Sequence, residues 1–172
     1  MDNSLKIVEI TSISDYKKFV NFQFKLYYDN PFWVPPIVNE EIDTINPNKN
    51  PVYNNSIAKF YLAYKNRKIV GRIAAIINWI EVKKINKKKI RFGWFDFIDD
   101  LSVSKALLNT VEAFGKEKGL KKIEGPMGFS NLDKSGMLIE GFNEMSTMIT
   151  LYNYPYYPKH LKLHGYKKEA VW

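Results

Sequence analysis

Residues 89–126 constrain the fold more than any other part of the chain, because they follow a strand, helix, strand pattern. Residues 91–98 are apolar at almost every position, which is typical of a central strand covered on both faces. From residue 101 to residue 118 the apolar residues recur at helical spacing instead. Residues 121–125 then form a short second strand. This order predicts a right-handed βαβ unit in which the two strands are parallel neighbours.

The part of the chain before this unit predicts an antiparallel meander. Residues 5–10 form a first strand, and a helix begins after a cap at Ser14. Residues 58–64 and 68–78 are two further strands that form a hairpin around a turn at residues 66–67. The second of these leads through a lysine-rich turn into the central strand.

The remaining connections are rich in proline or glycine. Residues 29–36 contain three prolines and form a loop whose aromatic residues fold back over the core. Residues 127–143 are irregular and glycine-spaced. The other elements we expect are a helix at residues 37–45, a strand at 147–151, a helix at 158–164 and a last strand at 166–171.

Length, composition and net charge narrow the class of protein. A length of 172 residues suits a single domain that covers residues 1–172. The chain has no cysteine, which excludes thiol nucleophiles and fits a reducing, cytoplasmic compartment. We expect no membrane span, because the longest apolar stretch is too short to cross a bilayer. The net charge of +8 comes from basic residues spread along the whole chain, so we do not expect nucleic acid as a partner.

The predicted order of elements, with a late helix ending in Gly165 and Tyr166, resembles the GCN5-related N-acetyltransferase (GNAT) superfamily. The segments NPFWVPP, GRIAAI, EGPMGFS and YNYPYYP, which begin at residues 30, 71, 124 and 152, more closely resemble a bacterial subfamily of GNAT-like proteins. The resemblance implies an α/β fold: a mixed sheet with an antiparallel meander and one parallel strand pair, flanked by helices. Members of that subfamily are usually longer, so residues 1–172 are interpreted as its N-terminal portion or as a short version.

The resemblance also implies that acyl-coenzyme A binds where strands 91–98 and 121–125 splay apart. Its contacts would come from Phe97, Ile98, Ser102 and Ser104. In the superfamily the diphosphate lies on amides of a glycine-rich loop that opens the helix. This chain has no glycine there and carries Asp99 and Asp100 instead, which at about 5 Å would oppose a diphosphate by several tenths to a few kcal/mol. As plain helix caps, these two residues would have no ligand role, and we favour that interpretation.

Asp96 is the first candidate for acid or base chemistry, because it lies within an otherwise apolar strand. By strand alternation it shares a face with Phe92 and Trp94. Desolvation there would raise the pKa of its carboxyl group and suit it to general base catalysis. An ion pair with a lysine is the alternative.

Two tyrosines are candidates for the general acid. The superfamily often uses a tyrosine about one helical turn before the final glycine-aromatic pair, but Leu161 occupies that position. Tyr156 and Tyr157 lie one turn earlier and could replace it, or they could simply pack as an aromatic start of the helix. His160 and His164 have the spacing of two metal ligands, but no acidic residue completes a zinc-binding pattern, so we expect no metal site.

We place the substrate cleft beside the central strand. Gly93 leaves one face of that strand without a side chain, which favours a bulge or a close approach there. The following loop leaves the carboxyl end of a parallel strand, where open α/β sheets bind ligands. The expected substrate contacts are Trp94, Ser130, Asn131, Asp133, Tyr152 and Asn153, and Tyr156 borders the same cleft.

Two functions remain open at this point, and both take a small-molecule or thioester ligand. The resemblance implies an N-acyltransferase that passes an acyl group from acyl-coenzyme A to an amine, with a degenerate pyrophosphate loop. The alternative is a non-catalytic protein of the same fold that binds a small ligand or a protein partner. The acidic start of the helix, at residues 99–104, favours a binding protein. The aromatic-lined gap around Gly93, Trp94 and Tyr152, where the two strands splay apart, keeps the acyltransferase open.

Overall fold

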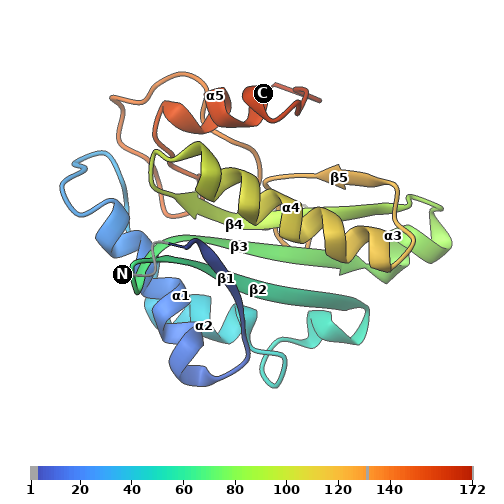
Figure 1. Cartoon of the computed structure of the whole chain (residues 1–172). Helices are drawn as coiled ribbons and strands as arrows, with labels where there is room; N and C mark the ends of the chain where they lie inside the picture. The colour runs from blue at the N-terminus through green and yellow to red at the C-terminus, as the bar shows by residue number, and fades with distance from the viewer. Residues whose placement is uncertain (1–3, 131, 172) are drawn as a thin grey trace.

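A computed structural model describes residues 4–130 and 132–171 of the chain. Its centre is a five-stranded sheet whose strands lie in sequence order (Figure 1). The strands are β1 (Lys6–Ile10), β2 (Ser56–Lys65), β3 (Lys68–Asn78), β4 (Lys89–Phe97) and β5 (Lys122–Glu124). Neighbours from β1 to β4 are antiparallel, whereas β4 and β5 are parallel. The predicted mixed sheet with one parallel pair is therefore confirmed.

Helices cover both faces of this sheet. The crossover helix α4 (Leu101–Glu117) packs on one face, and α5 (Tyr156–Leu163) lies near its first turn (Figure 1). On the opposite face lie α1 (Ile13–Leu26) and α2 (Val38–Ile45). Two short elements, the 3₁₀-helix η1 (Pro51–Asn54) and α3 (Trp79–Lys84), lie in connections. In the described part of the chain, every helix is too short or too polar to cross a bilayer.

The side chains of β3 alternate between two cores, as strand geometry requires. Ile73, Ala75 and Ile77 face the α4 side, whereas Ala74 and Ile76 face α1 and α2. All five are fully buried, because helices cover both faces. The hairpin turn before β3 forms as predicted, with positive φ angles of 52° and 62° at Asn66 and Arg67.

The first helix begins two residues earlier than we predicted. Its N-cap is Ser12 rather than Ser14, and the Ser12 hydroxyl accepts from the Asp15 amide at 3.1 Å. The Ser12 hydroxyl also donates to the Asp15 carboxylate at 2.6 Å. This exchange resembles a capping box, in which a residue three positions on supports the cap. A further helix, α3, replaces part of the lysine-rich turn, because the Asn78 side chain accepts from the amides of Ile80 and Glu81.

The two late strands that we predicted, at residues 147–151 and 166–171, are absent. In the first segment the Thr147 and Thr150 side chains bond each other's backbone amides, at 3.2 Å and 2.8 Å, and close a turn. In the second segment Tyr166 packs on Phe92 and donates to Glu112 of α4, whereas residues 167–171 are exposed. Because the side chains of residues 167–171 are exposed, this segment has no buried face that would hold it in the sheet as a strand.

Candidate functional site

A cavity of about 270 Å³ opens where β4 continues past the end of β5. β5 pairs only with the first residues of β4, from Lys89 to Arg91. The chain then leaves the sheet, with one last bond from the Met127 amide to the Phe92 carbonyl at 2.8 Å. The rest of β4 therefore has no strand neighbour on this side. The connection from residue 126 to residue 153 covers that gap and forms much of the cavity wall.

A β-bulge in β4 determines which side chains face the cavity. Between the pairs Ala74–Gly93 and Arg72–Asp96, β4 has two residues where β3 has one. Trp94 takes a positive φ of 43° within this bulge. Gly93 is required there, because a Cβ would lie 2.4 Å from the Met127 carbonyl oxygen. The bulge and the close approach that we predicted at Gly93 are both confirmed.

The bulge also corrects our assignment of faces. Phe92 packs in the core on the α4 side, whereas Trp94 packs on the α1 side. The extra residue in the bulge shifts the alternation, so Asp96 does not share a face with Phe92. Asp96 lies instead beside Trp94 in the cavity wall, opposite Arg72 of β3.

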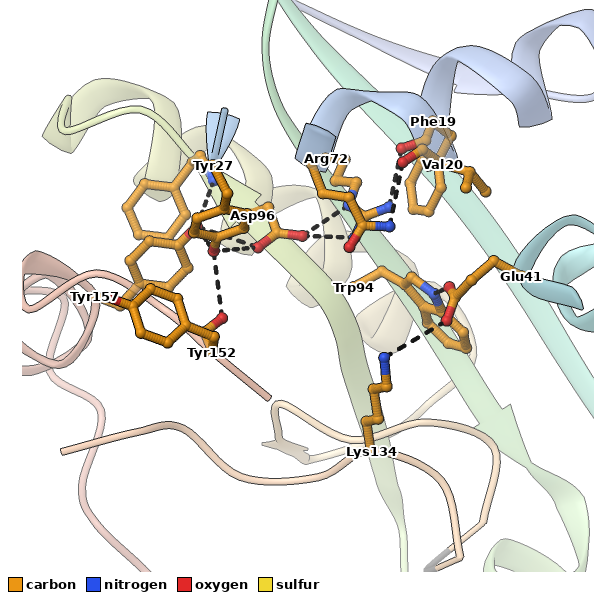
Figure 2. Close-up of polar contacts among 12 residues, drawn as sticks. Phe19, Val20, Tyr27, Glu41, Arg72, Trp94, Asp96, Lys134, Tyr152 and Tyr157 are labelled. Atoms are coloured by element: carbon orange, nitrogen blue, oxygen red, sulfur yellow. Dashed lines mark hydrogen bonds and ion pairs between the residues drawn. The ribbon is translucent and has the colours of Figure 1, made fainter. Parts of the chain in front are cut away.

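Asp96 is held by four donors (Figure 2). Its Oδ2 accepts from Arg72 Nε at 2.8 Å and pairs with Arg72 Nη2 at 2.7 Å. Its Oδ1 accepts from the hydroxyls of Tyr27 at 2.8 Å and Tyr157 at 3.2 Å. The ion-pair partner is therefore an arginine and not the lysine that we considered. Each carboxylate oxygen thus has two polar contacts, which orient Asp96 and the groups around it.

Arg72 is itself fixed from α1. Its Nη1 donates to the Phe19 carbonyl at 2.9 Å, and its guanidinium lies 5.1 Å from the centre of the Phe19 ring. The side chain is 4% exposed. A buried charge of this kind is tolerated when it is paired and hydrogen-bonded, and here both conditions hold. This role of Arg72 was not predicted from the sequence, although a lone arginine within an apolar strand was the available signal.

The two phenols form the proton-bearing part of the site. The hydroxyl oxygens of Tyr27 and Tyr157 are 2.9 Å apart, and each also reaches Asp96. Burial, with the neighbouring Asp96 charge, raises the pKa of Tyr27 well above its ordinary value. Burial and the adjacent Tyr27 do the same to the pKa of Tyr157. The Tyr27 hydroxyl also reaches the Tyr152 carbonyl at 3.4 Å. Two hydroxyl protons thus serve four oxygen–oxygen contacts, so the network has more than one hydrogen arrangement. Tyr27 was not predicted from the sequence.

On the other side of the cavity, Trp94 is oriented by α2. Its indole Nε1 donates to Glu41 Oε2 at 2.7 Å, and Lys134 Nζ lies 3.9 Å from Glu41 Oε1 (Figure 2). Asp133 lines the cavity and accepts from the Ser130 amide at 2.7 Å. Ser130 itself is not in the wall and only closes this turn. Asn131, which we predicted as a contact, lies outside the described residues.

Tyr152 and Asn153 complete the wall and anchor the long connection. The Tyr152 hydroxyl donates to the Phe142 carbonyl and accepts from the Asn30 side chain, both at 2.9 Å. The Asn153 side chain accepts from the Leu138 amide at 2.7 Å and donates to the Leu138 carbonyl at 3.1 Å. The structure therefore brings Trp94, Asp96, Asp133, Tyr152, Asn153 and Tyr157 together at one cavity. Their part in a reaction stays a prediction.

Comparison with known proteins identifies the fold. No protein-family model matches the chain. A predicted acetyltransferase of Clostridium acetobutylicum, crystallised with acetyl-CoA, superposes with a TM-score of 0.57 at 14% identity, covering 98% of this chain and 94% of that one. An aminoglycoside acetyltransferase from a soil metagenomic sample, in complex with sisomicin, gives a TM-score of 0.50 at 18% identity over 72% and 77% of the two chains. The chain has the GNAT fold.

Two curated bacterial proteins are similar in sequence to this GNAT-fold chain. Protein YghO of Escherichia coli (strain K12) is 36% identical over 155 residues, which are 90% of this chain and 40% of that protein. A bacterial ceramide synthase of Caulobacter vibrioides is 24% identical over 165 residues, which are 95% of this chain and 43% of that protein. The chain thus spans about two fifths of the length of these relatives.

The residues that the GNAT resemblance assigned to coenzyme A are occupied by the protein's own side chains. The Tyr156 hydroxyl donates to the Phe97 carbonyl at 2.5 Å, and the Phe97 amide donates to the Tyr157 hydroxyl at 3.2 Å. The Ile98 amide donates to the Val70 carbonyl at 3.0 Å. The free edge of β4 at Phe97 is therefore satisfied by α5, whereas the Ile98 bond continues the pairing with β3. Tyr156 therefore bonds the backbone of β4 and does not line the cavity.

The first turn of α4 is likewise occupied by the protein's own side chains. Asp100 caps the helix by accepting from the Ser102 amide at 2.8 Å and pairs with Lys65 at 2.9 Å. These hydrogen bonds, from Ser102 first and then Lys65, lower the pKa of Asp100 to about 2. The predicted capping role is thus confirmed for Asp100, whereas Asp99 contacts His160 instead. The Asp100 carboxylate holds one of the first-turn amides, which are the groups that bind a diphosphate at a helix start.

Ser104 is bound by two histidines from α5. Its hydroxyl lies 2.9 Å from His160 Nδ1 and 2.8 Å from His164 Nε2, and His160 Nε2 lies 2.9 Å from the Asp99 carboxylate. Burial first, and the neighbouring His160 second, lower the pKa of His164. Ser104 is fully buried, so this cluster joins α5 to α4 and presents no accessible nucleophile. Among the described residues, no group of three or more His, Cys, Asp or Glu side chains is placed to hold a metal ion.

Proposed function

We propose that this chain carries an acyl-transfer site that passes an acyl group from a thioester to an amine. The observation that supports it is the cavity beside the unpaired part of β4, where two neutral phenols meet a paired carboxylate. A GNAT fold and a relative named a bacterial ceramide synthase agree with this chemistry, since a ceramide is the amide of a long-chain amino alcohol. We therefore propose an amine with a long aliphatic chain as the acceptor.

The reaction makes two demands on the site. The amine nitrogen forms a bond to the thioester carbonyl carbon while the carbon–sulfur bond breaks. The amine must lose a proton, and the departing sulfur must gain one. Tyr157 and Tyr27 keep their protons at neutral pH because burial raises their pKa values. One phenol donates its proton to the departing sulfur. The proton that the amine loses passes to the phenolate so formed, directly or by way of the other phenol across their 2.9 Å contact, so that both phenols end protonated.

Asp96 and Arg72 act as positioning residues in this scheme. The carboxylate holds both phenols through one oxygen, and the guanidinium holds the carboxylate through the other. A hydrogen-bonded site that is already in place needs no reorganisation when charge develops. The apolar wall, which includes Trp33, Met137 and Leu151, suits the aliphatic part of a substrate.

The first turn of α4, where Asp100 already bonds the Ser102 amide, affects the choice of acyl donor. Because the Asp100 carboxylate already occupies a first-turn amide and would repel a diphosphate, we propose that the site recognises the acyl and thioester groups rather than the nucleotide end of coenzyme A. A second candidate, ligand binding without transfer, draws its support from the same occupied first turn.

The test compares two donors with one long-chain amine, such as sphinganine, and detects the amide by mass spectrometry. The donors are palmitoyl-coenzyme A and the palmitoyl thioester of N-acetylcysteamine, which lacks the nucleotide and diphosphate. We expect amide from both, with kcat/KM values of the same order. Binding of amine and thioester without any amide would instead identify a binding protein.

The Tyr157→Phe variant tests the proton donor, and Tyr53→Phe is its matched control. Tyr53 donates to the Ile45 carbonyl at 2.7 Å and does not line the cavity. We expect Tyr157→Phe to lower kcat by about 10²-fold or more, as loss of a general acid does. The control should keep kcat within about threefold. Unchanged turnover in folded Tyr157→Phe would remove the phenol network from the mechanism.

A further inference from the structure

The mouth of the cavity has an exposed apolar rim. Leu132, Met148 and Ile149 line the cavity and are 93%, 53% and 80% exposed. Met145, which precedes two of them in the same loop, is 71% exposed. These side chains come from the connection between β5 and α5, which is coloured orange in Figure 1. Scattered exposed apolar residues are ordinary, but a group at the entrance of a cavity indicates an interaction site.

The loop that carries most of this rim contains no charge. From Met145 to Leu151 every residue is apolar or a serine or threonine. The amides of Thr147 and Thr150 are bonded by each other's hydroxyls, and the Thr150 hydroxyl also contacts the Thr147 carbonyl at 3.4 Å. Because these backbone groups are bonded within the turn, they lose little on entering a medium poor in water. This property suits a lipid surface.

The loop is also held in place from behind. The Ser146 amide donates to the Phe32 carbonyl at 2.8 Å, and the Val34 amide donates to the Ser146 hydroxyl at 3.0 Å. The turn therefore has a fixed base on the loop at residues 29–36. Met148 and Ile149 extend beyond that base, where the protein's core does not cover them.

The overall charge and the open cavity agree with such a surface. The net charge of +8 is spread along the chain, so it provides long-range attraction to an anionic surface, whereas the apolar rim sets which face docks. The cavity of about 270 Å³ opens at this rim, so a long aliphatic substrate would enter it past Leu132, Met148 and Ile149. This step rests on the proposed function.

We propose that the cavity mouth docks on an anionic lipid bilayer, with Leu132, Met148 and Ile149 entering the interfacial region. A lipid-borne substrate then passes from the bilayer into the cavity without crossing water. The proposal concerns surface binding only, because these loops are far too short to span a bilayer.

Vesicle flotation tests the docking without any substrate. The vesicles are phosphatidylcholine alone, or phosphatidylcholine with a quarter phosphatidylglycerol, each in 0.1 M and 0.5 M salt. We expect the wild type to float with the anionic vesicles and to keep part of its binding in 0.5 M salt. The double variant Met148→Ser/Ile149→Ser should bind at least tenfold more weakly, since each buried apolar side chain contributes about tenfold or more. The control Ile13→Ser changes a residue that is 49% exposed at the start of α1, and it should bind like the wild type.

Three outcomes would overturn the proposal. The first is that the wild type floats with neither vesicle. The second is that its binding vanishes in 0.5 M salt and is equal in the double variant, which would show attraction by charge alone. The third is that sedimentation reveals a dimer that the double variant abolishes, which would make the rim a contact between two copies. Acyl transfer to a short, water-soluble amine is measured in parallel, so that loss of docking and failure of the proposed function are separate results.

Discussion

The Arg72–Asp96 pair provides the sharpest test of how the site is built. Both side chains are nearly buried, with exposures of 4% and 12%. Removing one partner of such a pair leaves an uncompensated charge, which costs about 3–5 kcal/mol. Asp96→Asn keeps the shape and removes the charge. Its amide can direct its oxygen to Arg72 and its NH2 to the phenol oxygens, so we expect the lower end, about 3 kcal/mol.

Urea denaturation followed by tryptophan fluorescence measures this change in the free energy of unfolding. For a domain of this size, about 3 kcal/mol corresponds to a fall in Tm of about 6–12 °C. The matched control is Asp43→Asn, an exposed position on α2, which should stay within about 0.5 kcal/mol of the wild type. The double variant Arg72→Met/Asp96→Asn should recover much of the loss, because no buried charge remains.

A loss below about 1 kcal/mol in Asp96→Asn would refute this reasoning. It would mean that water or another group compensates the guanidinium, and that Asp96 does not hold the site together. Failure of the double variant to recover stability would point instead to the phenol contacts as the main source of the loss. The cycle of single and double variants separates these two terms.

Three further perturbations follow from the described contacts. Gly93→Ala should destabilise the protein by about 1–3 kcal/mol in thermal unfolding, because its Cβ would meet the Met127 carbonyl. The control is Gly119→Ala, where φ is +71° and no atom lies within 4 Å of the added Cβ. It should cost only about 1–2 kcal/mol, from backbone strain. The lowered pKa of Asp100 predicts that the stability difference between the wild type and Asp100→Asn is complete above about pH 5 and disappears as pH falls towards about 2, measured as unfolding free energy against pH. Ser104→Ala should cost about 1–3 kcal/mol in urea denaturation, because two histidine nitrogens lose their shared partner, and an unchanged midpoint would show that water replaces the hydroxyl.

Most of the sheet could be predicted from the sequence because its signals are local. The change from a strand pattern to a helical period marked the unit from β4 to β5, and Asn66 with Arg67 marked the hairpin. The bulge at Gly93 was also predictable, since a missing side chain in a central strand permits a close approach. The predicted strand at residues 147–151 failed because reciprocal threonine bonds offered the backbone a competing turn.

The order of the five sheet strands and the acidic cap at Asp100 followed from the sequence alone, because each depends on residues that are close in the chain. The GNAT architecture was implied by the resemblance of several segments. The site, in contrast, depends on tertiary packing. Asp96 meets Arg72, Tyr27 and Tyr157 across 24, 69 and 61 residues of sequence. No periodicity records such separations, and a single extra residue in the bulge moved Asp96 away from the face of Phe92. The partners of a buried charge follow from packing, since burial without partners would cost more than the fold can supply.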